Sequence, residues 1–369
     1  NILRRDAINR VSTMIGNMQL NPKQQEAVLH GEGPLLVLAG AGSGKTRVLT
    51  ERIIHLIQEK NVSPWNILAV TFTNKAAGVM KSRIENRLGP AVKNLWISTF
   101  HSSCLRILRR HTEELGYAPQ FVIYDDSDQK TLIKKILIDM NVSDRLFKPE
   151  VVLSFINKAK NEARRPADFV TQGAPFYKKI QEIYAAYQNT LKQNNAMDFG
   201  DLIANVVHLF ESHPAVCDHY QNQFQYILVD EYQDTNGAQY KLLRLLTQKS
   251  QNIFVVGDDD QSIYKFRGAE IKNILNFQRD YRGASVIKLE QNYRSTQTIL
   301  DAANAVIRQN KGRMGKRLWT DQGKGTHVVL SGSPTDRDEA EYICKTIAQF
   351  KVHMALKNLA IFYRTNAQS

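Results

Sequence analysis

The stretch Leu35-Leu-Val-Leu-Ala-Gly-Ala-Gly-Ser-Gly-Lys-Thr46 joins an apolar run to a glycine-rich loop that ends in Lys-Thr. Apolar residues then recur at helical spacing from Val48 to Ile57. This order predicts a strand, a tight loop and a helix, which is the unit of parallel α/β sheets. The backbone N–H groups of such a loop, together with the N-terminus of the following helix, attract phosphate oxygens.

A nucleotide is therefore the expected ligand of this loop, through Ala41, Gly42, Ser43, Gly44, Lys45, Thr46 and Arg47. Lys45 is expected to reach the β- and γ-phosphates, and Thr46 to hold Mg²⁺. The P-loop pattern has glycine where this chain has Ala39, and alanine is the smallest replacement. The alternative is a tight strand-to-helix turn that carries an incidental lysine.

Bulk composition narrows the class of protein. The chain has 369 residues, enough for two or three domains, and is 43% hydrophobic and 23% charged, as soluble globular proteins are. No stretch approaches the ~18 apolar residues that span a membrane. The first 18 residues contain no signal-peptide core. Cys104, Cys217 and Cys344 lie too far apart to indicate a disulfide framework or a zinc site, so we expect a reducing cytoplasm.

The formal net charge of +13 favours a polyanionic partner. Nucleic acid is favoured over a membrane surface as this partner, since no basic amphipathic anchor stands out. A basic segment, residues 156–165, is a further candidate for nucleic-acid contact. Its alternative interpretation is the solvated face of a helix.

Strand-like and helical runs alternate along the chain, which predicts a parallel α/β sheet. The expected strands are Pro34–Leu38, Ile67–Phe72, Leu95–Thr99, Tyr226–Asp230 and Asn252–Gly257. A second series adds strands at Val286–Glu290, His327–Gly332 and Leu359–Tyr363 and helices at Thr296–Arg308 and Asp336–Phe350.

We therefore divide the chain into a first α/β domain over 1–110 and 196–285, an inserted helical subdomain over 111–195, and the beginning of a second α/β domain over 286–369. The second series ends directly after a strand, so we expect this domain to be incomplete in the chain.

The run Tyr226-Ile-Leu-Val-Asp-Glu231 ends an apolar strand in two carboxylates. In P-loop proteins the first acid at such a strand end holds Mg²⁺, which assigns Asp230 to the metal. Glu231 beside it remains free to take a proton from the attacking water. The alternative is a strand end with two solvated acids.

A further apolar strand leads to Asp258 and Gln261, and an amide such as Gln261 can sense a γ-phosphate or position water. The following Tyr264-Lys-Phe-Arg267 alternates aromatic and basic side chains. Aromatic platforms interleaved with cations hold single-stranded nucleic acid without reading its sequence. The alternative places Tyr264 and Phe266 in the core.

Two other strand ends carry short polar groups. Phe72 and Asn74 follow one strand, and His101 follows the next. These groups suit contacts to phosphates and bases. His101 alone is more typical of a hydrogen-bonded structural histidine than of a ligand.

Eight segments occur in an order that resembles the UvrD/Rep/PcrA group of superfamily 1 DNA helicases. They are residues 20–28, 39–46, 71–77, 98–101, 229–234, 257–269, 289–295 and 360–369. The resemblance runs from about Met18 to the last residue. It implies a RecA-like motor with an inserted helical subdomain, followed by the start of a second RecA-like domain.

The resemblance also implies roles. Gln24 would read the adenine edge, Tyr293 would stack on the adenine, and Arg294 would reach the γ-phosphate as an arginine finger. Gln261 would couple the γ-phosphate to DNA movement. The single-strand path would be lined by Phe72, His101, Tyr264, Phe266 and Arg267, with Arg364 and Asn366 in a DNA-contacting loop. Phe266 stands where the family usually has tryptophan.

These features predict an ATP- and Mg²⁺-dependent helicase that moves 3′-to-5′ on single-stranded DNA, in DNA repair or replication restart, present here as its N-terminal part. Its partners would be single strands, single/double-strand junctions and possible repair or replication proteins, and no membrane. The first alternative is a nucleotide-gated single-stranded-DNA-binding module that does not unwind. The second is the helicase subunit of a recombination nuclease complex, against which the close spacing of Lys45 and Asp230 argues.

Overall fold

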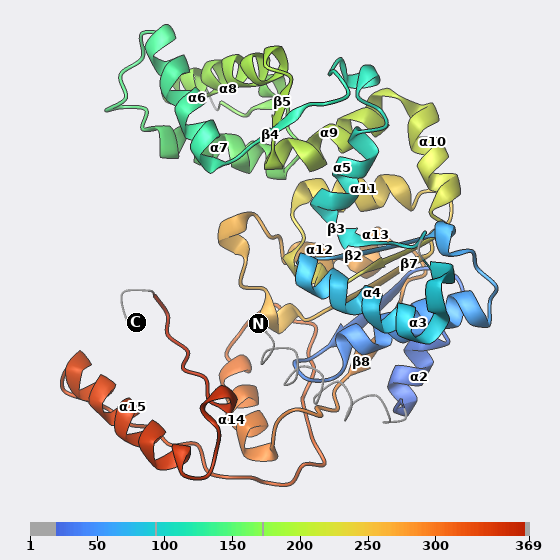
Figure 1. The fold of residues 1–369 in the computed structure, drawn as a ribbon, viewed down its shortest axis with the longest axis vertical. Coiled ribbons are helices and arrows are strands. Elements are labelled where there is room, and N and C mark those ends of the chain that lie inside the picture. The colour runs from blue at the N-terminus through green and yellow to red at the C-terminus, as the bar shows by residue number, and fades with distance from the viewer. Residues whose placement is uncertain (1–19, 93, 172, 366–369) are drawn as a thin grey trace. The chain divides into compact units, whose positions relative to one another are not determined.

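A computed structural model describes residues 20–92, 94–171 and 173–365 (Figure 1). The strands are β1 (Leu35–Ala39), β2 (Ile67–Thr71), β3 (Trp96–Thr99), β4 (Val122–Tyr124), β5 (Ala196–Asp198), β6 (Tyr226–Val229), β7 (Ile253–Gly257) and β8 (Ser285–Leu289). The helices are α2 (Pro22–Val28), α3 (Lys45–Gln58), α4 (Asn74–Leu88), α5 (Phe100–Leu108), α6 (Asp126–Asp139), α7 (Pro149–Asn161), α8 (Pro175–Gln193), α9 (Phe199–Ser212), α10 (Pro214–Gln223), α11 (Gly237–Leu246), α12 (Lys272–Leu275), α13 (Phe277–Asp280), α14 (Gln297–Ile307) and α15 (Asp336–Lys351).

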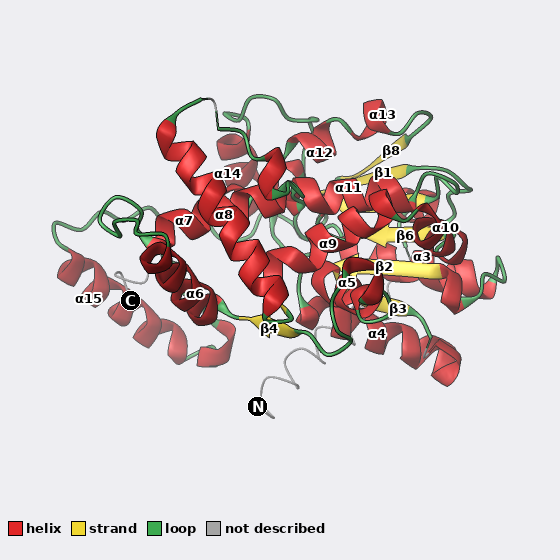
Figure 2. Cartoon of the chain, turned by 90° about the horizontal axis from the view of Figure 1, so that it is seen from above, coloured by secondary structure: helices red, strands yellow, loops and turns green. Residues whose placement is uncertain are grey.

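Six strands form one parallel sheet in the order β3-β2-β6-β7-β1-β8. This confirms the predicted α/β class and the first five expected strands to within one residue at either end. In a parallel sheet all carboxyl ends lie at the same edge, so the segments that follow these strands gather there. Figure 2 shows the strands as one layer among the helices.

Both faces of the sheet are buried, which explains the uninterrupted apolar runs of the strands. Alternate residues of β1 enter different cores. Leu35, Val37 and Ala39 pack in a core with α2, α3 and α4. Leu36 and Leu38 pack in a larger core with α5, α9 and α11. The sheet is therefore held from both sides, which fixes the loops at its carboxyl edge.

The segment between β4 and β5 is mainly helical, as expected, and α6, α7 and α8 share a core of their own. The short parallel pair β4–β5 was not predicted from the sequence. These strands contain three residues each, too few to show a period of two.

A buried ion cluster ties α7 to the start of α9. The Lys160 ammonium lies 2.6 Å from Asp198 and 2.8 Å from Asp201, and all three side chains are at most 2% exposed. Tyr187 also donates to Asp198, at 2.9 Å. Asp198 and Asp201 in turn cap α9 reciprocally. Lys160 is thus a structural residue, and this part of the basic segment is not available to nucleic acid.

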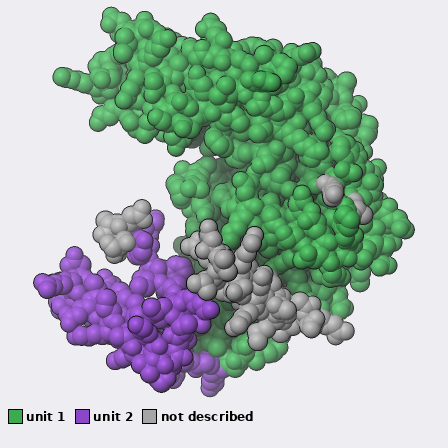
Figure 3. Space-filling view, in the orientation of Figure 1, with its two compact units in different colours: residues 1–323 green, residues 324–369 purple. Residues whose placement is uncertain are grey.

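Strand β8 is hydrogen-bonded to β1 along its whole length. The first sheet therefore extends past residue 285, where we expected the second motor domain to begin. The chain divides into two compact units, one up to Gly323 and one from Lys324 onward, which are coloured separately in Figure 3. The division into motor and insertion remains a prediction.

In the second unit the expected helix is present as α15, but the described residues contain no strand at 327–332 or 359–363. Those two predictions were wrong for this structure. A strand requires a hydrogen-bonded neighbour, and the side chains of Leu330 and Phe362 are 98% and 93% exposed. Within the described part of the chain, no helix is long and apolar enough to cross a membrane.

Replacing Lys160 with methionine should lower the free energy of unfolding by about 3–5 kcal/mol, because two buried carboxylates lose their only cation. Urea-induced unfolding followed by circular dichroism measures this change. Lys158→Met is the matched control, since Lys158 is exposed on the same helix. Equal midpoints for the two variants would contradict a role for the cluster in holding α7.

Candidate functional site

The glycine-rich loop after β1 forms a cradle whose conformation requires glycine. Gly42 and Gly44 have φ values of 69° and 90°, in the left-handed region. A Cβ atom on Gly42 would lie 2.6 Å from the Asn292 amide, and one on Gly44 would lie 2.9 Å from the Gln24 amide. Gly44 caps α3 without a side chain. The loop therefore presents backbone N–H groups at a helix N-terminus, as a phosphate site requires.

The side chains predicted to handle phosphate and metal lie together at this cradle. Lys45 Nζ is 3.1 Å from Glu231 Oε2, and the Lys45 side chain is only 11% exposed. The Thr46 hydroxyl is 3.4 Å from Asp230 Oδ2. A hydroxyl and a carboxylate at this distance can hold a hard divalent cation between them. The interpretation of the loop as a turn with an incidental lysine does not explain these pairs.

Asp230 is buried at the end of β6, and its environment opposes ionisation. Burial and the charge of Glu231 raise the pKa of Asp230 to about 6, although the charge of Lys45 partly opposes them. The Glu231 N–H donates to Asp230 Oδ1 at 3.0 Å and fixes its orientation. No cation contacts this carboxylate directly among the described residues. A bound metal ion would therefore stabilise its ionised form.

Glu231 has a left-handed backbone, with φ of 50°. Such strain in a residue other than glycine is concentrated at functional sites. Its side chain is 35% exposed, so one side of the carboxylate can meet water. The two acids at the strand end are therefore not equivalent solvated groups: one is buried beside Thr46 and the other faces solvent beside Lys45.

Gln233 links Glu231 to the next strand. Its Nε2 donates to Glu231 Oε2 at 2.8 Å, and its Oε1 accepts from the Asp258 N–H at 2.9 Å. Gln261, predicted to sense the γ-phosphate, donates from Nε2 to Asp258 Oδ2. The structure thus connects Gln261 to the general-base candidate through Asp258, which uses its side chain and its backbone N–H, and through the side chain of Gln233.

Asp258, Asp259 and Asp260 could form a metal cluster by their mutual distances. A lysine already occupies their centre: Lys316 Nζ lies 2.5–2.6 Å from all three. Arg313 adds two bonds to Asp260, at 2.6 and 2.8 Å. Burial opposes ionisation of Asp260, but Arg313 and Lys316 lower its pKa overall. This cluster is an ion network that holds the Gln261 segment, not a metal site.

The residues after β8 close over the glycine-rich loop. Asn292 Nδ2 donates to the Ala41 carbonyl at 2.6 Å, and the Tyr293 N–H donates to the Gly42 carbonyl at 3.0 Å. Arg294 follows directly, with its Cβ close to Gly42. The predicted adenine and γ-phosphate contacts, Tyr293 and Arg294, are thus at the same cradle as Lys45.

Gln24, the expected adenine reader, is buried beside the loop. Its Nε2 donates to the Ser43 carbonyl at 2.9 Å, and its Oε1 accepts from the Asn21 N–H at 3.0 Å. Asn21 also donates to the Tyr293 hydroxyl at 2.8 Å. Gln24 and Tyr293 are therefore joined through one side chain, which places the expected adenine contacts in a single group.

A second site at the same sheet edge gathers the aromatic residues. The rings of Phe72 and Tyr264 lie 5.0 Å apart between centroids, and those of Tyr264 and Phe266 lie 6.0 Å apart. The Arg267 guanidinium lies 5.4 and 5.6 Å from the last two rings. Phe266 is 79% exposed, which excludes the alternative that it is a core residue. We call Phe72, Tyr264 and Phe266 the aromatic row.

The aromatic row borders a pocket of about 290 Å³. The pocket is lined by Thr71, Phe72, Thr99, Phe100, His101, Asn161, Asp234, Asn236, Gln239, Tyr264 and Arg267. Burial lowers the pKa of His101, so its ring is neutral near pH 7. The exposed ring of Phe199 contacts His101, with centroids 5.9 Å apart. This aromatic residue was missed in the sequence, where a lone phenylalanine at a helix start gives no signal.

Three predicted residues remain besides Arg47, which lies in the first turn of α3 next to the cradle. Asn74 is an exposed first residue of α4 that does not line the pocket. Arg364 belongs to the second unit. Asn366 lies outside the described residues.

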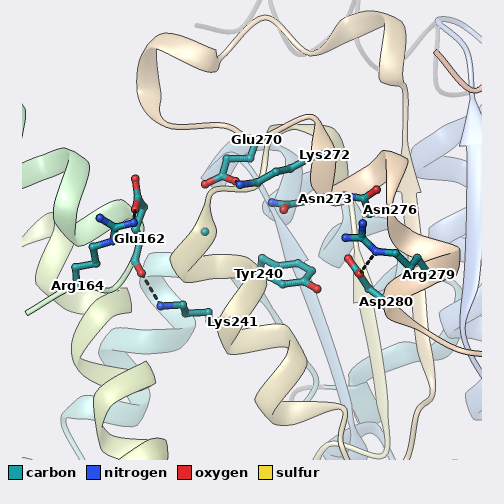
Figure 4. A pocket seen from close by; sticks show the side chains of 11 residues that line it. Glu162, Arg164, Tyr240, Lys241, Glu270, Lys272, Asn273, Asn276, Arg279 and Asp280 are labelled. Atoms are coloured by element: carbon teal, nitrogen blue, oxygen red, sulfur yellow. Dashed lines mark hydrogen bonds and ion pairs between the residues drawn. The ribbon is translucent and has the colours of Figure 1, made fainter. Parts of the chain in front are cut away.

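Another pocket, shown in Figure 4, lies between the end of α7 and the segment from α11 to α13. Its cations are already paired: Arg164 with Glu162 at 2.7 Å, Lys272 with Glu270 at 2.5 Å, and Arg279 with Asp280 at 3.2 Å. Lys241 donates to the Glu162 carbonyl at 2.8 Å. Three of the four cations that line the pocket are therefore neutralised by carboxylates, which leaves Lys241 alone to attract a phosphate.

Four residues that build the site were missed in the sequence: Gln233, Asn292, Arg313 and Lys316. Gln233 and Asn292 lie in the segments 229–234 and 289–295 that carry the family resemblance, but only their contacts in the structure identify a role. Lys316 lies 56 residues after Asp260, and no local pattern links residues at such a separation.

Comparison with known proteins agrees with this geometry. The model of the UvrD/REP helicase N-terminal domain matches residues 20–282, and that of the UvrD-like helicase C-terminal domain matches residues 287–369. A protein of Leuconostoc citreum named ATP-dependent DNA helicase PcrA is 51% identical over 363 residues, 97% of this chain and 48% of that protein.

Proteins with the same name from Staphylococcus aureus (strain Mu50) and Staphylococcus epidermidis are each 50% identical, over 95% and 97% of this chain. The chain covers 48% and 49% of their lengths. It therefore spans about half the length of the curated relatives it matches.

Asp230→Asn should stabilise the nucleotide-free protein at pH 7. A raised pKa means that the native state holds its proton to a higher pH than the unfolded chain, so the ionised form costs stability above about pH 6. A rise of about two pKa units corresponds to at most about 3 kcal/mol. Thermal unfolding at pH 7 should show a higher midpoint for the variant.

The difference should shrink as the pH falls below about 6 and disappear below about pH 3, where Asp230 is protonated in both states of the wild-type protein. Asp144→Asn, at an exposed position, is the control. A lower midpoint for Asp230→Asn at pH 7 would show that the carboxylate contributes net stability.

Proposed function

The chain belongs to the UvrD/REP helicase family, and we propose that it hydrolyses ATP to move along single-stranded DNA and to separate the strands of duplex DNA. The relatives are ATP-dependent DNA helicases by name, and we carry that activity over to this chain. The single observation that supports it best is the placement of the nucleotide cradle and the aromatic row at one edge of the same sheet.

In the proposed reaction the cradle binds the phosphates of ATP. Lys45 exchanges its ion pair with Glu231 for the β- and γ-phosphates, which leaves Glu231 free to accept a proton from water. Thr46 and Asp230 fit a Mg²⁺ ion, which would neutralise charge on the transferring group. Arg294, beside Gly42, is placed to stabilise the γ-phosphate.

The aromatic row supplies the proposed DNA site. The three rings of the row lie side by side and are partly or well exposed, so they can stack on bases. Arg267 can contact the DNA backbone between them. His101 and Phe199 extend the apolar surface beside the pocket. The 3′-to-5′ direction, the role in repair or replication restart, and the binding of junctions rest on the family resemblance alone.

A nucleotide-gated binding module is the second candidate, and it is compatible with the same two sites. The two functions differ in whether ATP turnover drives the separation of DNA strands. We expect single-stranded DNA to stimulate ATP turnover, and turnover to support the separation of a duplex with a 3′ tail.

A coupled assay of ATP turnover and strand separation tests this proposal. Lys45→Ala should reduce turnover by about 10²-fold or more, because a charge at the transferring phosphate is lost. DNA-stimulated turnover without strand separation would favour the binding module or a translocase. Full turnover by Lys45→Ala would mean that the cradle is only a structural turn.

Phe266→Ala should weaken single-stranded DNA binding by roughly 5- to 150-fold, since stacking contributes about 1–3 kcal/mol per base. Nucleotide affinity should not change, because the contacts of this ring are with Tyr264 and Arg267 and not with the residues of the cradle. Fluorescence titration with a labelled oligonucleotide measures the loss.

Phe350→Ala, which removes another exposed phenylalanine, is the matched control and should bind normally. Unchanged affinity in Phe266→Ala would remove the aromatic row from the DNA site.

A further inference from the structure

Gln233 occupies a central position at the carboxyl edge of the sheet. It is 1% exposed, and its two N–H groups donate to Glu231 Oε2 at 2.8 Å and Asp234 Oδ2 at 3.2 Å. Its Oε1 accepts from the Asp258 N–H. Both donors and the oxygen are engaged, so this amide cannot move without changing its contact with Glu231.

Asp234 is the partner of Gln233 on the side of the aromatic row. Its Oδ1 is buried and has no hydrogen-bond partner among the described residues. Asp234 is also the only acidic residue that lines the pocket beside the row. A buried acceptor without a partner costs free energy that a donor would recover.

The order of the strands explains why these two residues can link the sites. They follow β6, which lies between β2, the strand that leads to Phe72, and β7, the strand that leads to Asp258. Glu231 is in the same turn. One turn of the chain therefore carries the general-base candidate at one end and a pocket-lining carboxylate at the other.

We propose that Gln233 and Asp234 form a relay by which a nucleobase in the pocket positions Glu231. This inference rests on the proposed function. A base supplies N–H donors on its edge, whereas a phosphate would be repelled by the carboxylate. The Asp234 carboxylate turns readily about its last side-chain bond, so Oδ1 can take a donor from the pocket.

When Oδ1 gains this donor, Oδ2 shifts with it, and Gln233 follows because it donates to Oδ2. The same amide donates to Glu231 Oε2 and therefore reorients the carboxylate that accepts the proton from water. Gln233 and Asp234 are positioning residues in this scheme, since neither contacts the reacting atoms.

Two variants test the relay from its two ends. Asp234→Asn keeps an oxygen for Gln233 but replaces the unpartnered acceptor with an N–H donor. Gln233→Leu removes the amide at nearly constant volume. In each, the ratio of ATP turnover with a single-stranded oligo(dT) to turnover without it should fall by about tenfold, an ordinary coupling between sites.

Gln223→Leu is the matched control. It makes the same substitution at a buried glutamine of α10 whose side-chain polar atoms have no partners, outside both sites. Its turnover ratio should equal that of the wild-type protein. Circular dichroism confirms folding, and if Gln233→Leu does not fold, Asp234→Asn decides.

The double variant should lose no more stimulation than the more severe single variant, because both act on one network. Additive losses, or an unchanged ratio in folded Asp234→Asn, would overturn the relay. So would a loss of oligo(dT) affinity that matches the loss of stimulation, since Asp234 would then be a DNA contact only. Absence of stimulation in the wild-type protein would refute the proposed function itself.

Discussion

The constraint on which this structure depends is the parallel arrangement of six strands. It brings every carboxyl end to one edge of the sheet, so segments far apart in the sequence meet there. Lys45 follows β1, Phe72 follows β2, His101 follows β3, Glu231 follows β6, and Gln261 follows β7. Tyr293 and Arg294 follow β8. The parallel sheet thus gives the nucleotide residues and the aromatic row a common rigid support.

This constraint also separates what the sequence could predict from what it could not. The strands were predicted well because buried parallel strands are continuous apolar runs, and the groups that follow them were predicted with them. The Phe266 ring could not be placed by pattern, since alternation of aromatic and basic residues fits both a core strand and an exposed turn. Its exposure is set by tertiary structure.

The errors have a physical origin as well. The strand at 285–289 was predicted from the sequence, but its pairing with β1 was not, because hydrophobicity does not encode which sheet a strand joins. The ion partners Lys160 and Lys316 were missed for a related reason. A buried lysine resembles any other lysine in sequence until the fold brings carboxylates within about 3 Å of it.

The largely buried carboxylates described above fall into two groups, according to whether a cation contacts them. Asp198 and Asp201 surround Lys160, and Asp258, Asp259 and Asp260 surround Lys316. Each of these clusters carries its own cation and therefore serves the fold.

Asp230 and Asp234 differ in that no ion pair within the described ranges reaches them. Burial raises the pKa of each to about 6, as it does for Asp201, but Asp201 has the ammonium of Lys160 beside it. A carboxylate buried without a cation costs stability, and a protein keeps such a cost where a ligand removes it. Asp230 would be relieved by a metal ion and Asp234 by an N–H donor. The two uncompensated acids thus mark the two ends of the turn after β6, one at the nucleotide cradle and the other at the aromatic row.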